Sequence, residues 1–192
     1  MKTLEQIWEE ENLQLDDHNQ KGTSKFSAHP YAEKYDELFL PWREKQFKLL
    51  EIGALYGAST IIWDKYFPKA DITVVDIEDR NATINTQGRI DSERTKLIFG
   101  DAYTEEFANN LGTFDIINDD GPHTLEAMRK CIELYFPKLN SGGFLIIEDI
   151  PQQHWVEEFE SMLPGIKTET IDYTSVPNIK KMSDSRIFIA WK

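Results

Sequence analysis

Acidic side chains stand at or just after the end of five short apolar runs in this sequence. The runs are rich in β-branched and aromatic residues, which is typical of buried strands. In an open sheet of parallel strands, ligands bind beyond the carboxyl ends of the strands, so these acids would meet at one edge. An acid at any one of these positions can be explained as the cap of the helix that follows. Capping is a poor explanation for acids at the ends of all five runs. The acids are Glu51, Asp76, Asp101, Asp119, Asp120, Glu148 and Asp149.

A turn with two glycines, Gly53-x-x-x-Gly57, follows the first run. Glycines let the backbone approach a ligand closely at the positive end of the next helix. Asp76 comes 23 residues after Gly53, the spacing of an acid that binds the ribose of a nucleotide cofactor. NAD and S-adenosylmethionine both fit this pairing. S-adenosylmethionine is favoured because the turn lacks a third glycine for a pyrophosphate, and because Glu51 would attract an ammonium and a sulfonium.

The elements that must position these residues alternate along the chain. We expect strands at 47–52, 71–77, 95–100, 114–118 and 143–148, with helices between them, two of which cover 58–65 and 125–135. This alternation predicts a parallel sheet covered on both faces. After a further helix near 155–163, two runs at 166–175 and 186–191 have no helix to connect them. We expect those two to pair antiparallel at one edge of the sheet.

Composition narrows the class of protein. The 192 residues carry 21 Lys and Arg against 34 Asp and Glu, a net charge of −13, and 40% are hydrophobic. So acidic a chain is a poor match for nucleic acid, which needs clustered basic residues, and its apolar runs are too short for a membrane span. The N-terminus is acidic where a signal peptide is apolar, and the single Cys131 excludes an intrachain disulfide. We therefore expect a cytoplasmic globular protein.

The pattern of polar and apolar residues changes near residue 47. Residues 1–46 form an N-terminal segment with a short first helix, a polar stretch over 12–30 typical of a loop or lid, and a second helix starting near Tyr31. Residues 47–192 contain the regular alternation. The sequence contains no internal repeat, and no linker separates the two parts, so we expect one compact domain overall.

Several motifs together resemble class I S-adenosylmethionine-dependent methyltransferases, and most closely the metal-dependent sugar O-methyltransferases of macrolide and aminocoumarin antibiotic pathways. The motifs lie in Leu49–Ser59, Val75–Ile77, Gly100–Ala102, Phe114–His123 and Gly142–Ile150, with Lys21-Gly-Thr-Ser and His29-Pro-Tyr31 upstream. Asp-Asp-Gly-Pro-His, which ends the fourth motif, is the most specific together with Glu148-Asp149. The resemblance implies an α/β, Rossmann-like methyltransferase fold: a seven-stranded, mostly parallel sheet with one antiparallel edge strand. Residues 47–192 would be the S-adenosylmethionine-binding methyltransferase domain.

The resemblance also implies roles for single residues. Asp120, Glu148 and Asp149 would bind Mg²⁺ or Mn²⁺, which agrees with the need of converging carboxylates for a bridging cation. His123 would be the general base beside Asp120, because the attacking hydroxyl must lose a proton that an imidazole can accept near neutral pH. Around the cofactor we expect Asp76 at the ribose, Asp101 and Ala102 at the adenine, and Glu51, Gly53 and Gly57 at the methionine part, with Ser59, Ile77, Asp119 and Tyr31 nearby.

These inferences predict an S-adenosylmethionine- and Mg²⁺-dependent O-methyltransferase that acts on a sugar or another polyhydroxylated small molecule. Tyr31, Tyr35 and Trp42 would help to form the acceptor pocket. By analogy with its relatives the protein would form a homo-oligomer, and we expect no nucleic-acid or membrane partner. Two alternatives stay open: a non-catalytic S-adenosylmethionine-binding module or partner subunit, and a nicotinamide-binding oxidoreductase.

The chain departs from the family's pattern in three places. Leu55-Tyr56 stands where a further glycine is common, Asn118 replaces an apolar residue, and Pro122 replaces a small serine. We expect Pro122 in the first turn of a helix, where proline is well tolerated.

Overall fold

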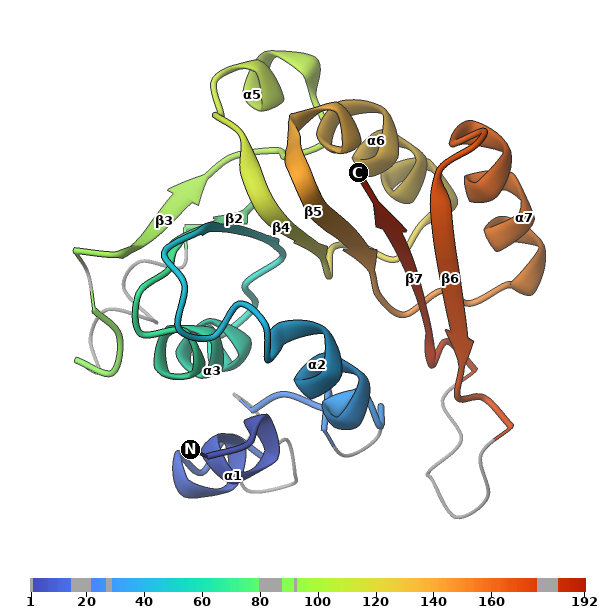
Figure 1. Ribbon diagram of the computed structural model, residues 1–192. Helices are drawn as coiled ribbons and strands as arrows, with labels where there is room; N and C mark the ends of the chain where they lie inside the picture. Colours follow the sequence, from blue (N-terminus) through green and yellow to red (C-terminus); the bar gives the residue numbers. More distant parts are fainter. Residues whose placement is uncertain (1, 15–21, 27–28, 80–87, 92, 176–182) are drawn as a thin grey trace.

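A seven-stranded sheet forms the centre of the computed structural model (Figure 1). The strand order is β3-β2-β1-β4-β5-β7-β6. The strands are β1 (Lys48–Ile52), β2 (Asp71–Asp76), β3 (Thr95–Phe99), β4 (Phe114–Asp119), β5 (Leu139–Ile147), β6 (Lys167–Asp172) and β7 (Arg186–Trp191). The structure describes residues 2–14, 22–26, 29–79, 88–91, 93–175 and 183–192. His18 and Lys21, which belong to the polar stretch, lie outside the described residues.

The predicted fold class is confirmed. Strands β1 to β5 pair in parallel with their neighbours, whereas β7 runs antiparallel to both β5 and β6. The reversed strand β7 therefore lies one place in from the edge, and β6 is outermost. The pair β6 and β7 needs no helix between its strands because antiparallel neighbours do not require a crossover.

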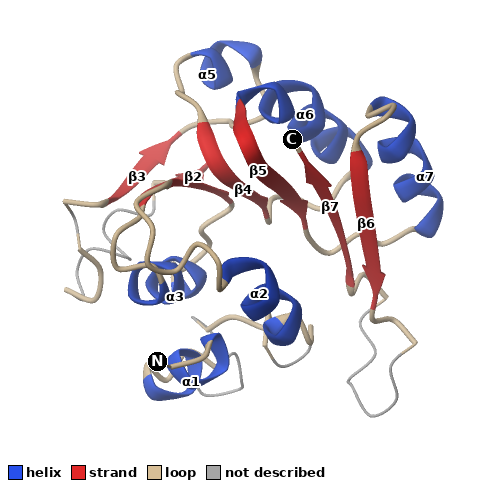
Figure 2. Ribbon diagram, viewed as in Figure 1, coloured by secondary structure: helices blue, strands red, loops and turns tan. Residues whose placement is uncertain are grey.

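Helices cover both faces of the sheet, as Figure 2 shows. One face carries α1, α2 and α3, and the other carries α5, α6 and α7. Their bounds are α1 (Leu4–Glu10), α2 (Ala32–Phe39), α3 (Ala58–Tyr66), α5 (Glu105–Asn109), α6 (Leu125–Tyr135) and α7 (Gln153–Met162), with a 3₁₀ turn, η1, at Phe136–Lys138. None of the described helices is long and apolar enough to cross a membrane.

Local sequence signals set the start of α6, the helix that follows the Asp-Asp-Gly motif. Thr124 is the N-cap, and its hydroxyl accepts a hydrogen bond of 3.3 Å from the backbone N–H of Ala127. Thr is a favoured cap because its oxygen satisfies an otherwise unpaired backbone donor. The expectation for Pro122 is wrong, since Pro122 precedes this cap and lies in the loop. Helix α6 begins at Leu125, as expected, and Pro122 belongs to the loop that leads to it.

An aromatic cluster joins the N-terminal segment to the sheet. Tyr35 and Phe39 of α2 are fully buried, with ring centroids 5.8 Å and 5.4 Å from that of Trp63 in α3. Phe39 also stacks on Phe144 of β5 at 6.2 Å. Aromatic pairs at these distances add to the free energy of simple burial. Helix α2 is thus part of the same hydrophobic core as α3 and the sheet.

Removal of the Phe39 side chain tests this packing. We expect Phe39→Ala to lower the free energy of unfolding by about 3–5 kcal/mol, because it leaves a cavity between α2, α3 and β5. This free energy is measured by urea unfolding, monitored by circular dichroism. Leu40→Ala is the matched control, since Leu40 is 60% exposed, and should change stability by less than about 0.5 kcal/mol. Equal stabilities of the two variants would show that α2 does not dock as described.

Candidate functional site

The register of three strands brings the predicted acids to one level. Asp119, the last residue of β4, pairs with Ile52 of β1 on one side and with Ile147 of β5 on the other. The residues that come next are therefore neighbours at the carboxyl edge of the sheet. They are Gly53, Asp120 and Glu148. The edge at which parallel α/β sheets bind ligands is thus lined by acids here.

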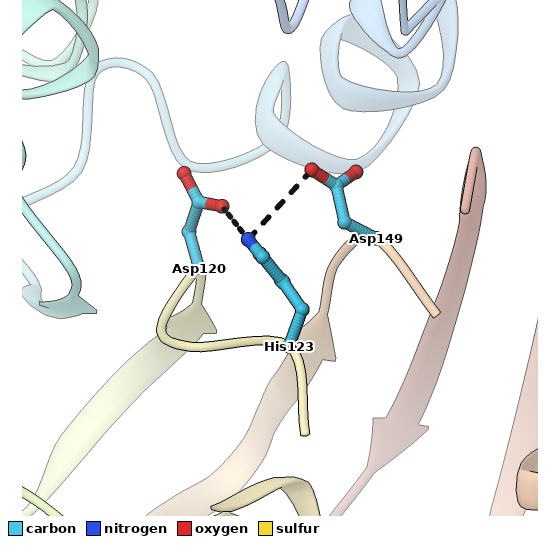
Figure 3. Close-up of side chains that lie close together, drawn as sticks. All are labelled: Asp120, His123 and Asp149. Atoms are coloured by element: carbon cyan, nitrogen blue, oxygen red, sulfur yellow. Dashed lines mark ion pairs between the residues drawn. The ribbon is translucent and has the colours of Figure 1, made fainter. Parts of the chain in front are cut away.

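Asp120, His123 and Asp149 form a cluster at this edge (Figure 3). The His123 Nε2 atom lies 3.6 Å from Asp120 Oδ1 and 4.0 Å from Asp149 Oδ2. Both His123 and Asp149 have left-handed backbones, with φ of 51° and 53°. Residues other than glycine rarely adopt this conformation, and it is frequent at functional sites. The structure therefore brings together two of the three acids predicted to bind a metal, Asp120 and Asp149, and the predicted base, His123.

Lys25 is the member of this site that the sequence did not reveal. Its Nζ lies 2.5 Å from Asp120 Oδ2 and 2.5 Å from Glu148 Oε2, and the residue is only 4% exposed. Burial alone would lower the pKa of Lys25, but the attraction of the acids outweighs it and the pKa is raised. Lys25 is therefore a buried, charged ammonium. Its sequence context, a short polar stretch, is typical of an exposed lysine.

The Glu148 carboxylate is completely buried and is held on both sides. Its Oε2 accepts a hydrogen bond from Lys25 Nζ, and its Oε1 accepts one of 2.6 Å from Asn118 Nδ2. Asn118 in turn accepts a bond of 3.4 Å from the Tyr35 hydroxyl. The polar residue at 118, where the family has an apolar one, is thus explained by its contact with Glu148. Glu148 faces Lys25 rather than the cluster of Figure 3, and its role as a metal ligand stays a prediction.

A second set of buried groups fixes Asp149. The Tyr31 hydroxyl donates a hydrogen bond of 2.5 Å to Asp149 Oδ1, and His29 Nδ1 lies 3.3 Å from the same oxygen. His29 Nδ1 also lies 3.0 Å from the hydroxyl of Ser185, just before β7. Burial lowers the pKa of His29, which favours a neutral imidazole. Tyr31 is fully buried, so it contacts Asp149 from the protein interior.

The acids of the cluster are shifted toward their neutral forms. The pKa values of Asp120 and Asp149 are raised, first because burial disfavours the charged carboxylate and also because Glu148 repels it. Lys25 opposes both shifts. The site therefore places three acids, Asp120, Glu148 and Asp149, against the single ammonium of Lys25, and a further cation would relieve the repulsion that raises these pKa values.

Two adjoining cavities open at this edge. The larger, of about 570 Å³, includes the predicted residues Gly53, Asp76, Ile77, Asp101, Ala102 and Asp120 in its lining. The smaller, of about 250 Å³, is lined among others by Gly53, Ser59, Lys25, Asp120, His123 and Asp149. Both touch Leu55 and Gly121. A ligand could thus extend from Asp76 to His123 across the Gly53 turn.

The Gly53 turn is held by contacts that only glycine allows. Gly53 has a φ of 91°, and a Cβ built there would lie 2.0 Å from the backbone oxygen of Asp120. Asp76 Oδ2 accepts hydrogen bonds of 2.9 Å and 3.0 Å from the backbone N–H groups of Ala54 and Leu55. The turn therefore rests directly on the Asp-Asp-Gly loop and is fixed from the other side by Asp76.

Several residues expected at a ligand line neither cavity. The Glu51 carboxylate is buried under α3, where it accepts hydrogen bonds from Thr60 and Trp63, and burial raises its pKa to about 7. Asp119 accepts a bond of 2.6 Å from Tyr103, and burial raises its pKa to about 6. Gly57, Tyr31, Tyr35 and Trp42 are also absent from both linings. Tyr35 and Trp42 belong to the aromatic core instead.

The donor set at the cluster suits a small divalent cation. Asp120, His123 and Asp149 each present a donor atom, and these atoms lie within 4.8 Å of one another. Carboxylate oxygens are the ligands of Mg²⁺ and Mn²⁺, and Mn²⁺ also accepts imidazole. The residues present therefore fit such an ion, with Asp120 and Asp149 as its oxygen donors.

Comparisons with known proteins agree with the predicted family. Residues 50–150 match the family model described as a methyltransferase domain. The chain is similar to L-olivosyl-oleandolide 3-O-methyltransferase of Streptomyces antibioticus, with 34% identity over 67% of this chain and 34% of that protein. It is also similar to mycinamicin VI 2''-O-methyltransferase of Micromonospora griseorubida, with 32% identity over 69% of this chain and 35% of that protein. The chain spans 34% to 42% of the length of the curated relatives it matches.

Solved structures share the fold. The MycE methyltransferase of mycinamycin biosynthesis, in complex with Mg, SAH and mycinamycin VI, has a TM-score of 0.69 at 24% identity, over 90% of this chain and 52% of that one. The O-methyltransferase TomG of Streptomyces achromogenes, in complex with SAM, has a TM-score of 0.65 at 15% identity, over 93% of this chain and 91% of that one. Together with the match over residues 50–150, the chain therefore belongs to the methyltransferase-domain family.

Proposed function

We propose that this protein transfers the methyl group of S-adenosylmethionine to a hydroxyl of a sugar or a glycosylated small molecule, with the help of Mg²⁺ or Mn²⁺. The observation that carries the proposal is the meeting of two cavities at the Asp120 loop, one lined by Asp76 and Asp101 and the other by Asp120, His123 and Asp149. The relatives support the acceptor class, because three of them are named for methylation of rhamnosyl or olivosyl compounds.

The larger cavity would hold the nucleoside part of the cofactor. Asp76 stands at the end of β2, where its carboxylate can accept hydrogen bonds from ribose hydroxyls. Asp101 and Ala102 follow β3 and would border the adenine. The Gly53 turn lies between the cavities, so the methionine part and the transferable methyl would pass over it toward His123. Ser59 of the smaller cavity would lie beside the methionine part.

The smaller cavity would hold the acceptor hydroxyl. A bound divalent cation would supply Lewis acidity that lowers the pKa of this hydroxyl. His123 presents Nε2 to the space between Asp120 and Asp149, and that nitrogen can take the proton as the oxygen attacks the methyl group. Asp120 would hold the imidazole and the hydroxyl in position. A module that only binds the cofactor would not need this cluster.

Calorimetric titration tests the cofactor assignment. We expect the wild-type protein to bind S-adenosylhomocysteine and not NAD, and Asp76→Ala to weaken that binding at least tenfold. The reason is the loss of charge-assisted hydrogen bonds, each worth about 1.5–3 kcal/mol, to the ribose and to the Gly53 turn. Asp71→Ala is the matched control, because Asp71 begins the same strand at the opposite edge of the sheet. Tight binding of NAD alone would overturn the assignment.

Methyl transfer to a panel of nucleotide sugars and glycosylated metabolites tests the catalytic assignment. Once an acceptor is found, we expect Asp120→Asn or His123→Ala to lower kcat by about 10²–10⁴-fold, because the first weakens the binding of the cation and the positioning of the hydroxyl, and the second removes the base. Affinity for S-adenosylhomocysteine should stay within about threefold of the wild type, since both residues act on the acceptor rather than the nucleoside. EDTA should lower kcat and added Mg²⁺ should restore it.

The control for this experiment is His154→Ala, because His154 is exposed on α7 and lines neither cavity. It should keep wild-type turnover. Undiminished turnover of both Asp120→Asn and His123→Ala would contradict the assigned roles. Full activity after exhaustive treatment with EDTA would remove the metal from the proposal while leaving the cofactor in place.

A further inference from the structure

Lys25 supplies the positive charge of the acid cluster. Its ammonium bonds to Asp120 and Glu148, and Asp149 and Glu51 are also close enough to stabilise its charged form. In the described part of the chain, no other lysine or arginine pairs with Asp120 or Glu148. One buried cation therefore faces several buried carboxylates, and it comes from the N-terminal segment rather than from the sheet.

The ammonium occupies oxygens that a metal ion would need. Each oxygen of Glu148 already accepts a hydrogen bond, Oε1 from Asn118 and Oε2 from Lys25, so a cation that binds Oε2 meets the ammonium. Asp120 also points one oxygen at Lys25 and turns the other toward His123. A divalent ion bound by Asp120 and Asp149, with or without the predicted ligand Glu148, would lie next to the ammonium, and two cations at that distance repel strongly inside a protein.

Lys25 also has space to move away. It lines the smaller cavity, of about 250 Å³, together with Gly22, Thr23 and Ser24. A lysine side chain has four flexible carbons and a compact charge, which allows its ammonium to turn into this space. Asp120, His123 and Asp149 border the same cavity.

We propose that Lys25 is a positioning residue that holds Asp120 and Glu148 in the metal-free protein and competes with a divalent cation for these two carboxylates. This inference rests on the metal of the proposed function. Lys25 keeps the acids in place when no metal is bound, and it thereby weakens the binding of the ion. The affinity of the site for a metal is then set by a residue of the N-terminal segment as well as by the acids themselves.

Binding of Mn²⁺ tests the competition directly. The probe is Mn²⁺ alone, its free concentration is read by electron paramagnetic resonance, and the proteins are the wild type, Lys25→Gln and Lys25→Arg. We expect Lys25→Gln to bind Mn²⁺ at least tenfold more tightly, because the carboxylates lose their internal cation. Its Tm in EDTA should fall below that of the wild type and recover with Mn²⁺. Lys25→Arg keeps the charge and should bind Mn²⁺ no more tightly than the wild type.

Lys34→Gln is the matched control. Lys34 also pairs with two carboxylates, those of Glu37 at 3.2 Å and Glu169 at 2.9 Å, but lines neither cavity. Its Mn²⁺ affinity should equal that of the wild type. A loss of Tm in Lys25→Gln without a gain in Mn²⁺ affinity would mean that Lys25 is merely structural, and would overturn the proposal.

A measurement on the wild type tests the competition even if Lys25→Gln does not fold. Reductive methylation with formaldehyde, followed by mass spectrometry, should label Lys25 several-fold faster with Mn²⁺ than in EDTA, because the ion displaces the ammonium. Equal rates of Lys25 labelling with Mn²⁺ and in EDTA, although Mn²⁺ is bound, would overturn the proposed competition. The metal of the proposed function would then still stand. Absence of Mn²⁺ binding in both the wild type and Lys25→Gln, with S-adenosylhomocysteine still bound, would instead remove the metal from the proposed function.

Discussion

Repulsion between carboxylates at one edge of the sheet is the constraint on which this site depends. The parallel register of β1, β4 and β5 brings Asp120 and Glu148 to the same level, and Asp149 follows at once. Like charges this close can persist only if some are neutralised, hydrogen-bonded or bridged by a cation. The structure does all of this, through raised pKa values, through Tyr31 and through Lys25.

The N-terminal segment carries much of this compensation. Lys25, His29 and Tyr31 reach the acids from outside the sheet, while Tyr35 and Phe39 anchor the following helix in the aromatic core. The same segment therefore contributes to the hydrophobic core and to the charge balance. A sheet with these loops but without this segment would leave buried carboxylates unpaired, which is strongly destabilising.

The sequence was most informative where the spacing of residues follows the topology. Strands that alternate with helices, and acids that end those strands, are enough to predict the sheet and the meeting of Asp120 with Asp149 at its edge. The place of His123 beside Asp120 could be expected only from the resemblance to a known family. Lys25 could not be predicted, because a lysine in a polar stretch is ordinarily exposed and its partners come from strands far along the chain. Glu51 shows a second limit: β1 is buried on both faces, so alternation does not tell whether a side chain points to the cavity or to α3.

The reversed direction of β7 has a consequence for how such a protein can diversify. Because β7 runs opposite to β5, its first residues lie at the edge where the parallel strands end, and Ser185 there touches His29. The described residues at the two ends of the connection between β6 and β7 thus lie beside the segment that holds the acids, with Ser185 against His29 and Tyr173 against Tyr31, while the paired strands stay in the sheet. Loop length changes the entropy of closure only slowly. Insertions in this connection can therefore remodel the surroundings of the acceptor while the strand register that places the carboxylates is preserved.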